Sequence, residues 1–495
     1  SSMLLQAFGL ALALCVVFIT HRISRLYTSP LNSMPCVPST SFVLGVMGDI
    51  FKEPPIIPQL RWARDHGGML IYRTFGNLKV LPTEAEALKR ILVVNARNYV
   101  KPHQTKWMLT QVAGESLLTT EGDSHARQRK YLNPAFHFTH LKTFVPVFCL
   151  QARTLADTWR RHLSQLASGE SFAELNISEE MNKVTLDIIG ITAFGFDFEA
   201  AKSEGYNKVN AAYKQVFANA GLSVSGLVRY LSNDWIPTGA AKRTNAALAI
   251  IRETVVEIVK RKRENPGGVS TDLLSLVIEQ TKQEAISEQE LVDQVMTFLV
   301  AGHETTATTL SWAMYLLSVN PDAQHKAAAE VRAVAGDKTL AWDDFEKMPF
   351  LAAVLDETLR LYPAAPITSR EALEDDTVAG HHIPKGTPII ICPGVVHRLE
   401  RYWPEPETFS PERFLPGGSG VETKKNPFAY LPFLVGERAC IGRRFALAEA
   451  TAVLATLLQS FSWEPVPGRP MRPKLAVTQR PFPDLHLRIV PRTAM

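Results

Sequence analysis

The sequence has few cysteines and only a small excess of charge, and both shortages argue against whole classes of protein. Five cysteines are scattered over 495 residues without a C-x-x-C spacing, which argues against a disulfide framework and against a structural zinc site. The formal net charge is +4 and charged residues make up 21% of the chain, too mild a balance to indicate nucleic-acid binding. We expect a globular protein whose main part lies in a reducing compartment.

Long apolar runs are also missing, with one exception at the start of the chain. Residues 3–20 are almost continuously apolar, interrupted by Gln6 and followed by Arg22 and Arg25. As an α-helix, such a run nearly crosses a hydrocarbon core of about 30 Å. It lacks a basic n-region and a clear cleavage site, so we interpret 1–22 as an uncleaved signal anchor with the rest of the chain cytosolic. A cleaved signal peptide and a buried core helix are the alternatives.

The segment after this run is rich in proline. Pro30, Pro35 and Pro38 stand among polar residues in 23–40, a composition that does not continue a helix and that suits a linker. The sequence therefore predicts that one large catalytic domain occupies 41–495.

Most of this domain is predicted to be helical, with a few short strands. Alternation on both sides of Gly76-Asn77 predicts a β-hairpin over 71–81, and another strand is predicted at 388–392. The clearest helical pattern covers 287–319, where an S-x-x-E capping pattern begins the helix and Asn320-Pro321 ends it. This helix would be about 50 Å long, so it must cross the domain.

The most specific pattern is FLVGERACIG at residues 433–442, which leads into a helical stretch at 443–461. It matches the signature F-x-x-G-x-R-x-C-x-G at all five fixed positions, so the chain resembles the cytochrome P450 family over roughly 41–490. Alone, Cys440 would more often be an inert buried cysteine; the whole pattern supports the resemblance. It implies one mainly α haem domain with a small β lobe, similar to fungal microsomal members.

The resemblance implies that Cys440 is the axial ligand of haem b. A thiolate donates electron density through iron and favours cleavage of the O–O bond. Gly436 and Gly442 let the backbone turn tightly, so that amide groups and the next helix N-terminus stabilise the negative sulfur. Phe433 is expected to pack beside the ligand, and Arg438 to pair with a haem propionate.

A second pattern, AGHETT at residues 301–306 in the long helix, resembles the oxygen-activating motif of the same family. Ala301 and Gly302 would leave room for dioxygen, and the Thr305 hydroxyl can bond inward and locally open the helix. Glu304, acting through water, and Thr305 would deliver protons. In isolation, the two residues would be a solvated glutamate and a packing threonine.

Further residues are assigned supporting roles by resemblance. Glu357, Arg360 and Arg413 are expected to form a buried ion-pair network that braces the haem loop. Residues 122–129 resemble the family's W-x-x-x-R propionate-binding helix, but His125 replaces the tryptophan. The expected propionate contacts, besides Arg438, are Arg129, His125, Arg370 and Lys101. No histidine lies in a glycine-containing loop that would let its side chain approach the haem iron closely. Histidine ligation of the iron is therefore not favoured.

The resemblance implies an NADPH-driven monooxygenase of the endoplasmic reticulum membrane, acting on an apolar small molecule. Nothing after Cys440 resembles a flavin domain, so a separate NADPH-cytochrome P450 reductase is expected, with cytochrome b5 as a further candidate partner. Lys424, Lys425, Arg443 and Arg444 are either its docking site or a solvated basic face. The expected substrate-pocket residues are Phe298, Ala301, Thr305, Ala365, Ile367 and Phe482.

Two other functions remain open at this point. One keeps the haem but rearranges or dehydrates a peroxide without a reductase, and the intact Glu304-Thr305 pair speaks against it. The other is a haem carrier or sensor without catalysis, which would need no proton relay. Fungal secondary metabolism is suggested by analogy with similar family members.

Overall fold

The structure is a computed structural model that describes residues 24–492 except 25, 167–171, 203–206, 219–237, 265–271, 282–285 and 337. The predicted anchor at 1–22 lies outside the described residues. Among the helices of the described part, none is both long and apolar enough to span a membrane.

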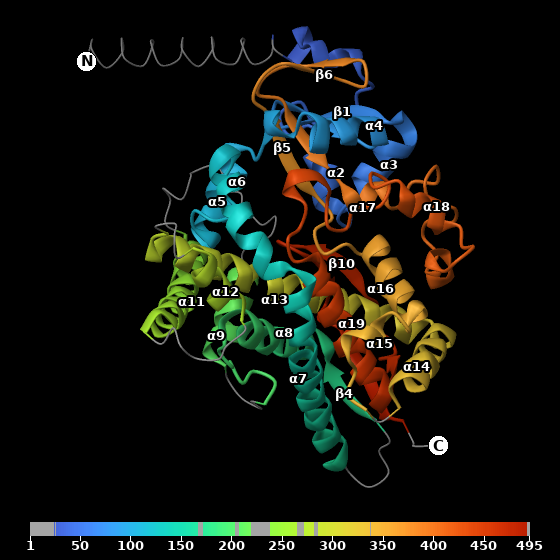
Figure 1. Ribbon diagram of the computed structural model, residues 1–495. Helices are drawn as coiled ribbons and strands as arrows, with labels where there is room; N and C mark the ends of the chain where they lie inside the picture. Colours follow the sequence, from blue (N-terminus) through green and yellow to red (C-terminus); the bar gives the residue numbers. More distant parts are fainter. Residues whose placement is uncertain are drawn as a thin grey trace.

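The fold is mainly helical with a small β lobe, as predicted, and the helices lie below the lobe in Figure 1. The α-helices are α2 (Met47–Lys52), α3 (Ile57–His66), α4 (Ala85–Lys89), α5 (His103–Ala113), α6 (Gly122–Leu132), α7 (Phe138–Ser164), α8 (Ile177–Phe194), α9 (Lys208–Ala218), α11 (Gly239–Glu264), α12 (Leu273–Gln280), α13 (Glu288–Val319), α14 (Pro321–Ala335), α15 (Trp342–Phe345), α16 (Pro349–Leu361), α17 (Pro393–Val396), α18 (Gly420–Lys425) and α19 (Arg443–Ser460). Short helical turns are η1 (Pro30–Ser33), η2 (Arg90–Val94), η3 (Ala96–Asn98), η4 (Asn133–Phe136), η5 (Pro411–Phe414) and η6 (Gly436–Arg438).

The strands are short and form separate small sheets. They are β1 (Met69–Thr74), β2 (Asn77–Pro82), β3 (Tyr99–Val100), β4 (Ala173–Asn176), β5 (Thr368–Ala372), β6 (Asp376–Val378), β7 (His381–Ile383), β8 (Pro388–Ile391), β9 (Phe461–Pro465), β10 (Arg472–Leu475), β11 (Gln479–Phe482) and β12 (His486–Pro491). In the described residues the largest sheet has the order β1-β2-β8-β5-β3 and belongs to the β lobe, while β10 and β11 pair as a hairpin.

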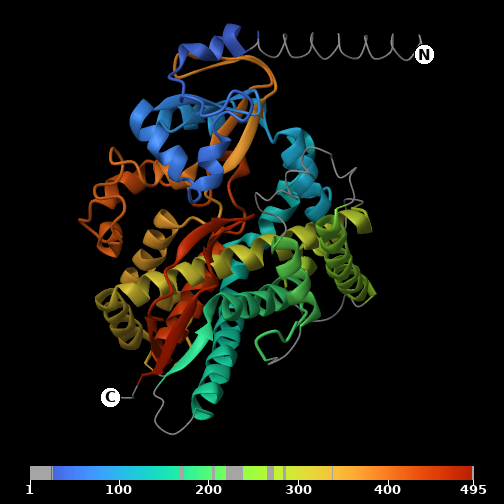
Figure 2. The same cartoon turned by 180° about the vertical axis from the view of Figure 1, so that it is seen from behind.

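Helix α13 crosses the middle of the domain, as predicted from its length and caps (Figure 2). The Ser287 side chain caps it by accepting the N–H of Glu290 at 3.1 Å. The Glu290 carboxylate does not complete a capping box; it accepts hydrogen bonds from Arg127 at 2.5 Å and Tyr131 at 3.0 Å, both on α6. The start of α13 is thereby fixed against α6.

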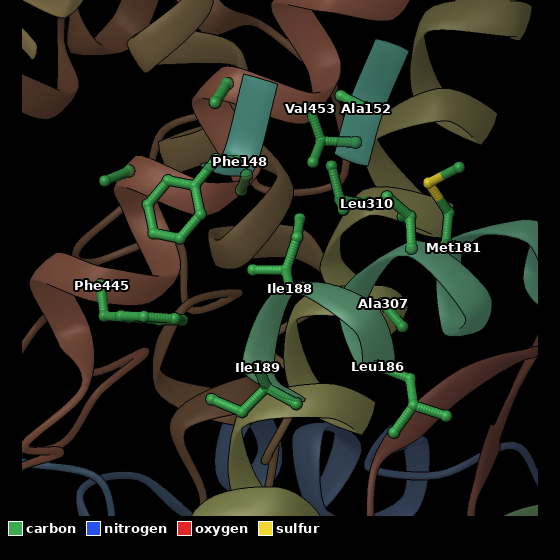
Figure 3. Close-up of a cluster of buried hydrophobic side chains, with 14 of the residues drawn as sticks. Phe148, Ala152, Met181, Leu186, Ile188, Ile189, Ala307, Leu310, Phe445 and Val453 are labelled. Carbon is green, nitrogen blue, oxygen red and sulfur yellow. The ribbon is translucent and has the colours of Figure 1, made fainter. Parts of the chain in front are cut away.

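The main hydrophobic core lies where α13 packs against α8 and α19, and α7 packs against these two helices. Figure 3 shows side chains from all four helices meeting there: Phe148, Ala152, Met181, Leu186, Ile188, Ile189, Ala307, Leu310, Phe445 and Val453. Each large side chain buried in this way stabilises the fold by about 1.5 to 3 kcal/mol. The core therefore fixes α13 and α19, which carry the two sequence motifs, relative to each other.

The predicted hairpin is present, but its turn is displaced by one residue. Thr74 pairs with Asn77, so the turn residues are Phe75 and Gly76, with φ of 48° and 71°. Positive φ at both positions is the geometry of a type I′ turn, which suits the right-handed twist of the strands. The strand predicted at 388–392 is β8.

The segment predicted as a linker is part of the folded domain. Leu31, Met34 and Val37 are 3–4% exposed and pack in the cores of the β lobe. The N–H of Val37 donates to the carbonyl of Ile71 at 2.9 Å, which attaches the segment to β1. The prolines had indicated only that the segment is not helical; buried side chains between them make it part of the domain.

Candidate active site

The loop around Cys440 is held in a tight turn by its backbone. The N–H of Cys440 donates to the carbonyl of Phe433 at 2.9 Å, and the N–H of Ala439 donates to that of Gly436 at 3.0 Å. Gly436 has φ of 79°, and a Cβ there would lie 2.1 Å from the carbonyl oxygen of Leu92. Only glycine fits this position, because other residues would meet both backbone strain and a clash.

Opposing effects act on the Cys440 thiol, and together they raise its pKa. Burial raises the pKa of the thiol, whereas the N–H of Gly442 and the guanidinium groups of Arg129 and Arg443 lower it. The N-terminus of α19 begins at Arg443, directly after the loop, and contributes a partial positive charge. The Arg443 guanidinium lies 5.9 Å from the centre of the Phe433 ring. The Cys440 side chain remains accessible, so its sulfur can bind a metal.

The AGHETT motif presents two small side chains from an otherwise buried stretch of α13. Ala301 is exposed, and the Thr305 hydroxyl donates inward to the Ala301 carbonyl at 2.6 Å. The inward bond is as predicted, but the helix remains α-helical from Glu288 to Val319, so the predicted local opening is not seen. Gly302 also differs from the prediction: a Cβ there would lie 2.8 Å from Ile189 Cδ1, so this glycine makes room for α8.

Glu304 is buried rather than solvated. Its side chain is 6% exposed, and Oε1 accepts a hydrogen bond from the Thr478 hydroxyl at 2.8 Å. Burial raises the pKa of the carboxyl, and Thr478 and Arg480 partly oppose that rise. A carboxyl with a raised pKa exchanges protons more readily near neutral pH.

His303 points to the other side of α13. It is 1% exposed, its ring lies 5.1 Å from that of Tyr213 on α9, and burial lowers its pKa to about 4. A neutral histidine packed between helices is a core residue, which agrees with the prediction that it does not ligate iron.

Three of the predicted propionate contacts come together at one buried place. Lys101 lies 3.5 Å from Glu121, Arg438 pairs with the same carboxylate, and Arg438 also donates to the Thr120 carbonyl at 2.7 Å. Burial, and then Arg438 and Arg370, lower the pKa of Lys101 to about 6. Burial lowers the pKa of Arg370 and of Arg438 to about 10. Lys101 and Arg438 thus share one carboxylate, and Arg370 lies close enough to act on Lys101.

This excess of buried positive charge fits the two carboxylates of a haem. Buried cations are stable only when anions neutralise them. Nη1 of Arg438 is buried and has no hydrogen-bond partner in the described part of the chain, so it has a donor to offer to an anion. With the accessible Cys440 sulfur, these residues fit haem b.

Helix α6 carries His125 and Arg129, which have different partners. His125 is 4% exposed, and its pKa is lowered to about 4 by burial, Lys101 and Arg129, so it is a neutral donor beside the cation cluster. Arg129 donates to the Ala439 carbonyl at 2.7 Å and to Asn133 Oδ1 at 2.9 Å. Arg129 therefore braces the Cys440 loop in this structure, and its contact with a propionate stays a prediction.

The structure joins the three residues predicted to brace the loop. Arg360 makes two hydrogen bonds to the Glu357 carboxylate, at 2.7 and 2.9 Å, and Arg413 makes one at 3.2 Å. The side chains are at most 5% exposed. Both arginines also donate to backbone carbonyls between residues 397 and 408. They therefore fix the segment that leads toward the Cys440 loop.

The predicted substrate residues fall into two groups. Ala301, Thr305, Ala365 and Ile367 are exposed or half-buried, and lie on α13 or in the segment before β5. The hairpin tip between β10 and β11 lies next to both elements, because Thr478 binds Glu304 and the N–H of Gln479 donates to the Ala364 carbonyl at 2.9 Å. Val477 at this tip is 44% exposed, and sequence reasoning missed it.

The other two predicted substrate residues have different positions. Phe298 is 8% exposed and packs against Phe136 in the core, with ring centres 5.4 Å apart. Phe482 lies under Lys474, whose Nζ is 4.4 Å from the ring centre, and lines a surface pocket. The other residues of that pocket are Arg469, Pro483, Asp484 and His486. Neither phenylalanine belongs with the Ala301 group.

These features define a class of protein that would hold a haem through a cysteine thiolate. The features are the Cys440 loop before α19, the AGHETT motif on α13 and the buried basic side chains. The model of the family Cytochrome P450 matches residues 59–486, and the chain belongs to this family. It is a cytochrome P450 monooxygenase, and the family implies a haem cofactor.

Similar proteins agree with this assignment. The chain is 32% identical to "Cytochrome P450 monooxygenase sphH" of Aspergillus fumigatus, over 88% of this chain and 84% of that protein. It is 30% identical to "Cytochrome P450 monooxygenase 205" of Postia placenta, over 95% and 93%. Among solved structures, the cytochrome P450DA heme domain superposes with a TM-score of 0.80 at 25% identity, covering 93% of this chain and 98% of that one.

Proposed function

We propose that this monooxygenase inserts one oxygen atom from dioxygen into an apolar small molecule, by hydroxylation or epoxidation. NADPH supplies the electrons through a separate reductase. The observation that carries this proposal is that the chain presents both an accessible Cys440 sulfur and, on α13, Thr305 bonded to the Ala301 carbonyl next to the buried Glu304. The chemistry that haem b supplies when bound is activation of dioxygen at its iron, which the thiolate ligand promotes.

The residues of the chain have separate roles in this proposal. Cys440 would hold the iron, and the N–H of Gly442 and the Arg443 guanidinium lower the pKa of its thiol. Lys101, Arg370, Arg438 and the neutral His125 bind the propionates. The Thr305 oxygen, whose own proton is donated to the Ala301 carbonyl, can accept a hydrogen bond from water on the accessible side of α13. Glu304 holds and releases protons from its buried carboxyl.

The substrate is proposed to be apolar because the side chains that face it are small and apolar. Ala301, Ala365 and Val477 are exposed and Ile367 is half-buried, so apolar groups that pack on them gain burial and exclude water. Fungal monooxygenases among the similar proteins support a place in fungal secondary metabolism.

The cellular setting follows from the sequence and from surface charge. We propose a single-pass anchor at 1–22 in the endoplasmic reticulum membrane, with the catalytic domain in the cytosol. Arg443 and Arg444 are exposed beside the Cys440 loop. With the exposed Lys425, they would attract the acidic flavin domain of NADPH-cytochrome P450 reductase, or cytochrome b5. The side chain of Lys424 lies outside the described residues.

The test of the haem-thiolate centre is the carbon monoxide difference spectrum of the reduced protein. Wild type, Cys440→Ser and Cys36→Ser are compared with haem quantified in each, because Cys36 is also an exposed cysteine but lies outside the site. A strongly red-shifted Soret band is expected in wild type and C36S and not in C440S. A histidine-type band in wild type, or absence of haem, would overturn the proposal.

The peroxide isomerase remains the alternative, and reductase dependence distinguishes it. Rearrangement of a peroxide needs no acid that delivers protons to dioxygen. Glu304 is buried, hydrogen-bonded to Thr478 and raised in pKa, which favours the monooxygenase. Product formation from an apolar substrate that requires NADPH and reductase is the expected result; turnover of hydroperoxides alone would favour the isomerase.

A further inference from the structure

The tip of the β10–β11 hairpin contacts the acidic residue of the oxygen motif directly. Thr478 is 2% exposed and donates its hydroxyl proton to Glu304 Oε1 at 2.8 Å. The Thr478 oxygen in turn accepts from the Thr308 hydroxyl at 3.4 Å. The three side chains form a short chain of hydrogen bonds from α13, through the hairpin, back to α13.

The tip is held firmly enough to position a side chain. The N–H of Ala476 donates to the Thr478 carbonyl at 3.0 Å and closes the turn. The next residue, Gln479, receives the indole N–H of Trp312 at 2.7 Å on its carbonyl and donates its own N–H to the Ala364 carbonyl. Thr478 is thus fixed between α13 and the segment before β5.

The same tip also faces the proposed substrate. Val477 precedes Thr478 and is 44% exposed, whereas Thr478 is buried. One turn therefore places an apolar side chain on the accessible side and a hydroxyl on the side of Glu304. Substrate that packs against Val477 can therefore move the backbone of the turn, and with it the Thr478 hydroxyl.

We propose that Thr478 is a positioning residue that holds the Glu304 carboxyl for proton transfer, and that the hairpin tip links this hold to substrate packing on Val477. The inference rests on the proposed function and adds a regulating element to its site. In the described residues the charged side chain that acts on Glu304 is Arg480, from the same hairpin. Proton delivery is thus set by the hairpin and not by α13 alone.

The polarity of the bond explains what Thr478 does. A hydroxyl that donates to a carboxylate stabilises the ionised form, while burial favours the protonated form. The Thr478 hydroxyl therefore opposes part of the rise in the Glu304 pKa that burial causes, which favours release of the proton. Without the hydroxyl, burial is opposed by Arg480 alone, and the carboxyl loses a partner that fixes its rotamer.

The experiment compares Thr478→Val, which keeps the shape, with Thr478→Ser, which restores the hydroxyl. Thr456→Val is the matched control, since Thr456 is also buried and donates only within its own helix α19. The carbon monoxide spectrum is recorded first. If wild type lacks the red-shifted band, the proposed function fails, and this outcome is distinct from a failure of the inference about Thr478. Infrared pH titration of the resting protein then follows the carboxyl band that Glu304→Gln removes.

In T478V we expect the ionised fraction of Glu304 to fall about tenfold at a given pH. The product formed per NADPH should decrease, while substrate affinity stays near that of wild type. T478S and T456V should resemble wild type in both measurements. The inference would be overturned if T478V kept the carbon monoxide spectrum, the pH titration of the Glu304 carboxyl band and the amount of product per NADPH of wild type.

A second variant keeps the test decisive if T478V does not fold. Thr478→Cys has similar size but a weak donor, so it should show the same changes in smaller measure. Val477→Ala tests the link to substrate. In wild type, substrate binding should shift the carboxyl band of Glu304. In V477A the band should have its wild-type position without substrate, and substrate should no longer shift it. A substrate-induced shift equal to that of wild type would refute the link.

Discussion

At Gly436 the backbone of the Cys440 loop lies directly against the carbonyl of Leu92 in the β lobe. The φ of 79° at Gly436, and the 2.1 Å that would separate a Cβ there from the Leu92 carbonyl oxygen, are two separate reasons for glycine. We expect Gly436→Ala to lower the free energy of unfolding by about 1 to 3 kcal/mol from backbone strain, with a further loss from the clash, and to weaken haem retention. Urea unfolding and haem content measure both.

Gly468→Ala is the matched control for this prediction. Gly468 has φ of 74°, but no atom lies within 4 Å of a Cβ there. It should therefore show the strain without the clash, and normal haem content. Equal losses of stability and haem in the two variants would show that the close approach to Leu92 does not matter.

Lys101 is a buried ammonium whose pKa is lowered to about 6 by burial, Arg438 and Arg370. In an unfolded chain a lysine titrates near about 10.4, so between these values the unfolded state binds more protons. The free energy of unfolding of haem-free protein should then rise with pH from about 6 to about 10. In Lys101→Met this contribution to the slope should be absent.

Urea unfolding of haem-free wild type and K101M at several pH values measures the difference. Burial also lowers the pKa of Lys79, but Lys79 is present in both proteins and cancels. Bound haem should flatten the wild-type slope, because propionates favour the charged ammonium. Identical slopes for the two haem-free proteins would show that Lys101 is not buried among cations.

At the scale of elements, α16 is fastened to the segment between β8 and the Cys440 loop by the Glu357 network. Glu357→Gln leaves the buried guanidinium groups of Arg360 and Arg413 without their anion. Breaking one partner of such a network costs about 3 to 5 kcal/mol. We expect a loss of this size in urea unfolding, accompanied by loss of the carbon monoxide band as the loop is released.

The exposed pair of Lys326 and Glu412 provides the control for this prediction. The two side chains are 59% and 49% exposed and their charged groups are 2.8 Å apart. Solvent and salt screen such pairs, so Lys326→Met should leave stability nearly unchanged. A loss in E357Q as small as that in K326M would mean that the buried network does not hold the loop.

Sequence predicted the elements well where local chemistry decides them. Ser287 and Pro321 set the ends of α13 because capping and the missing proline N–H act locally. The hairpin turn was misplaced because Asn77 is a typical turn residue, whereas strand pairing selected Phe75-Gly76. Phe298 and Phe482 were misplaced because neither helical nor strand periodicity tells which face meets the substrate and which meets the core.

At the scale of the whole molecule, the site depends on contacts between distant segments that no local pattern contains. Lys101, Arg370 and Arg438 are named by resemblance, but Glu121, the carboxylate that Lys101 and Arg438 share, was not. Thr478 and Val477 lack a motif, and only the packing of the hairpin tip on α13 reveals them. The family resemblance therefore supplies the ligand and the acid, while charge balance and positioning require the fold.

Two truncations at the N-terminus separate the proposed membrane anchor from the start of the folded domain. Deleting 1–23 removes the proposed anchor and leaves Leu31, Met34 and Val37 in the cores of the β lobe. Deleting 1–40 removes those side chains as well, each worth about 1.5 to 3 kcal/mol. We expect both proteins to leave the membrane fraction, and only the longer deletion to unfold at lower temperature and to lose haem.

Fractionation and thermal unfolding, with the carbon monoxide spectrum as the check on the site, distinguish the outcomes. Deletion of 1–23 that leaves the protein with the membrane fraction would contradict the anchor, and would mean that the folded domain binds lipid by itself. Equal stability of the two truncated proteins would contradict the packing of Val37 against β1, where its N–H meets the Ile71 carbonyl. Because each outcome concerns one boundary, the anchor and the start of the domain can fail independently.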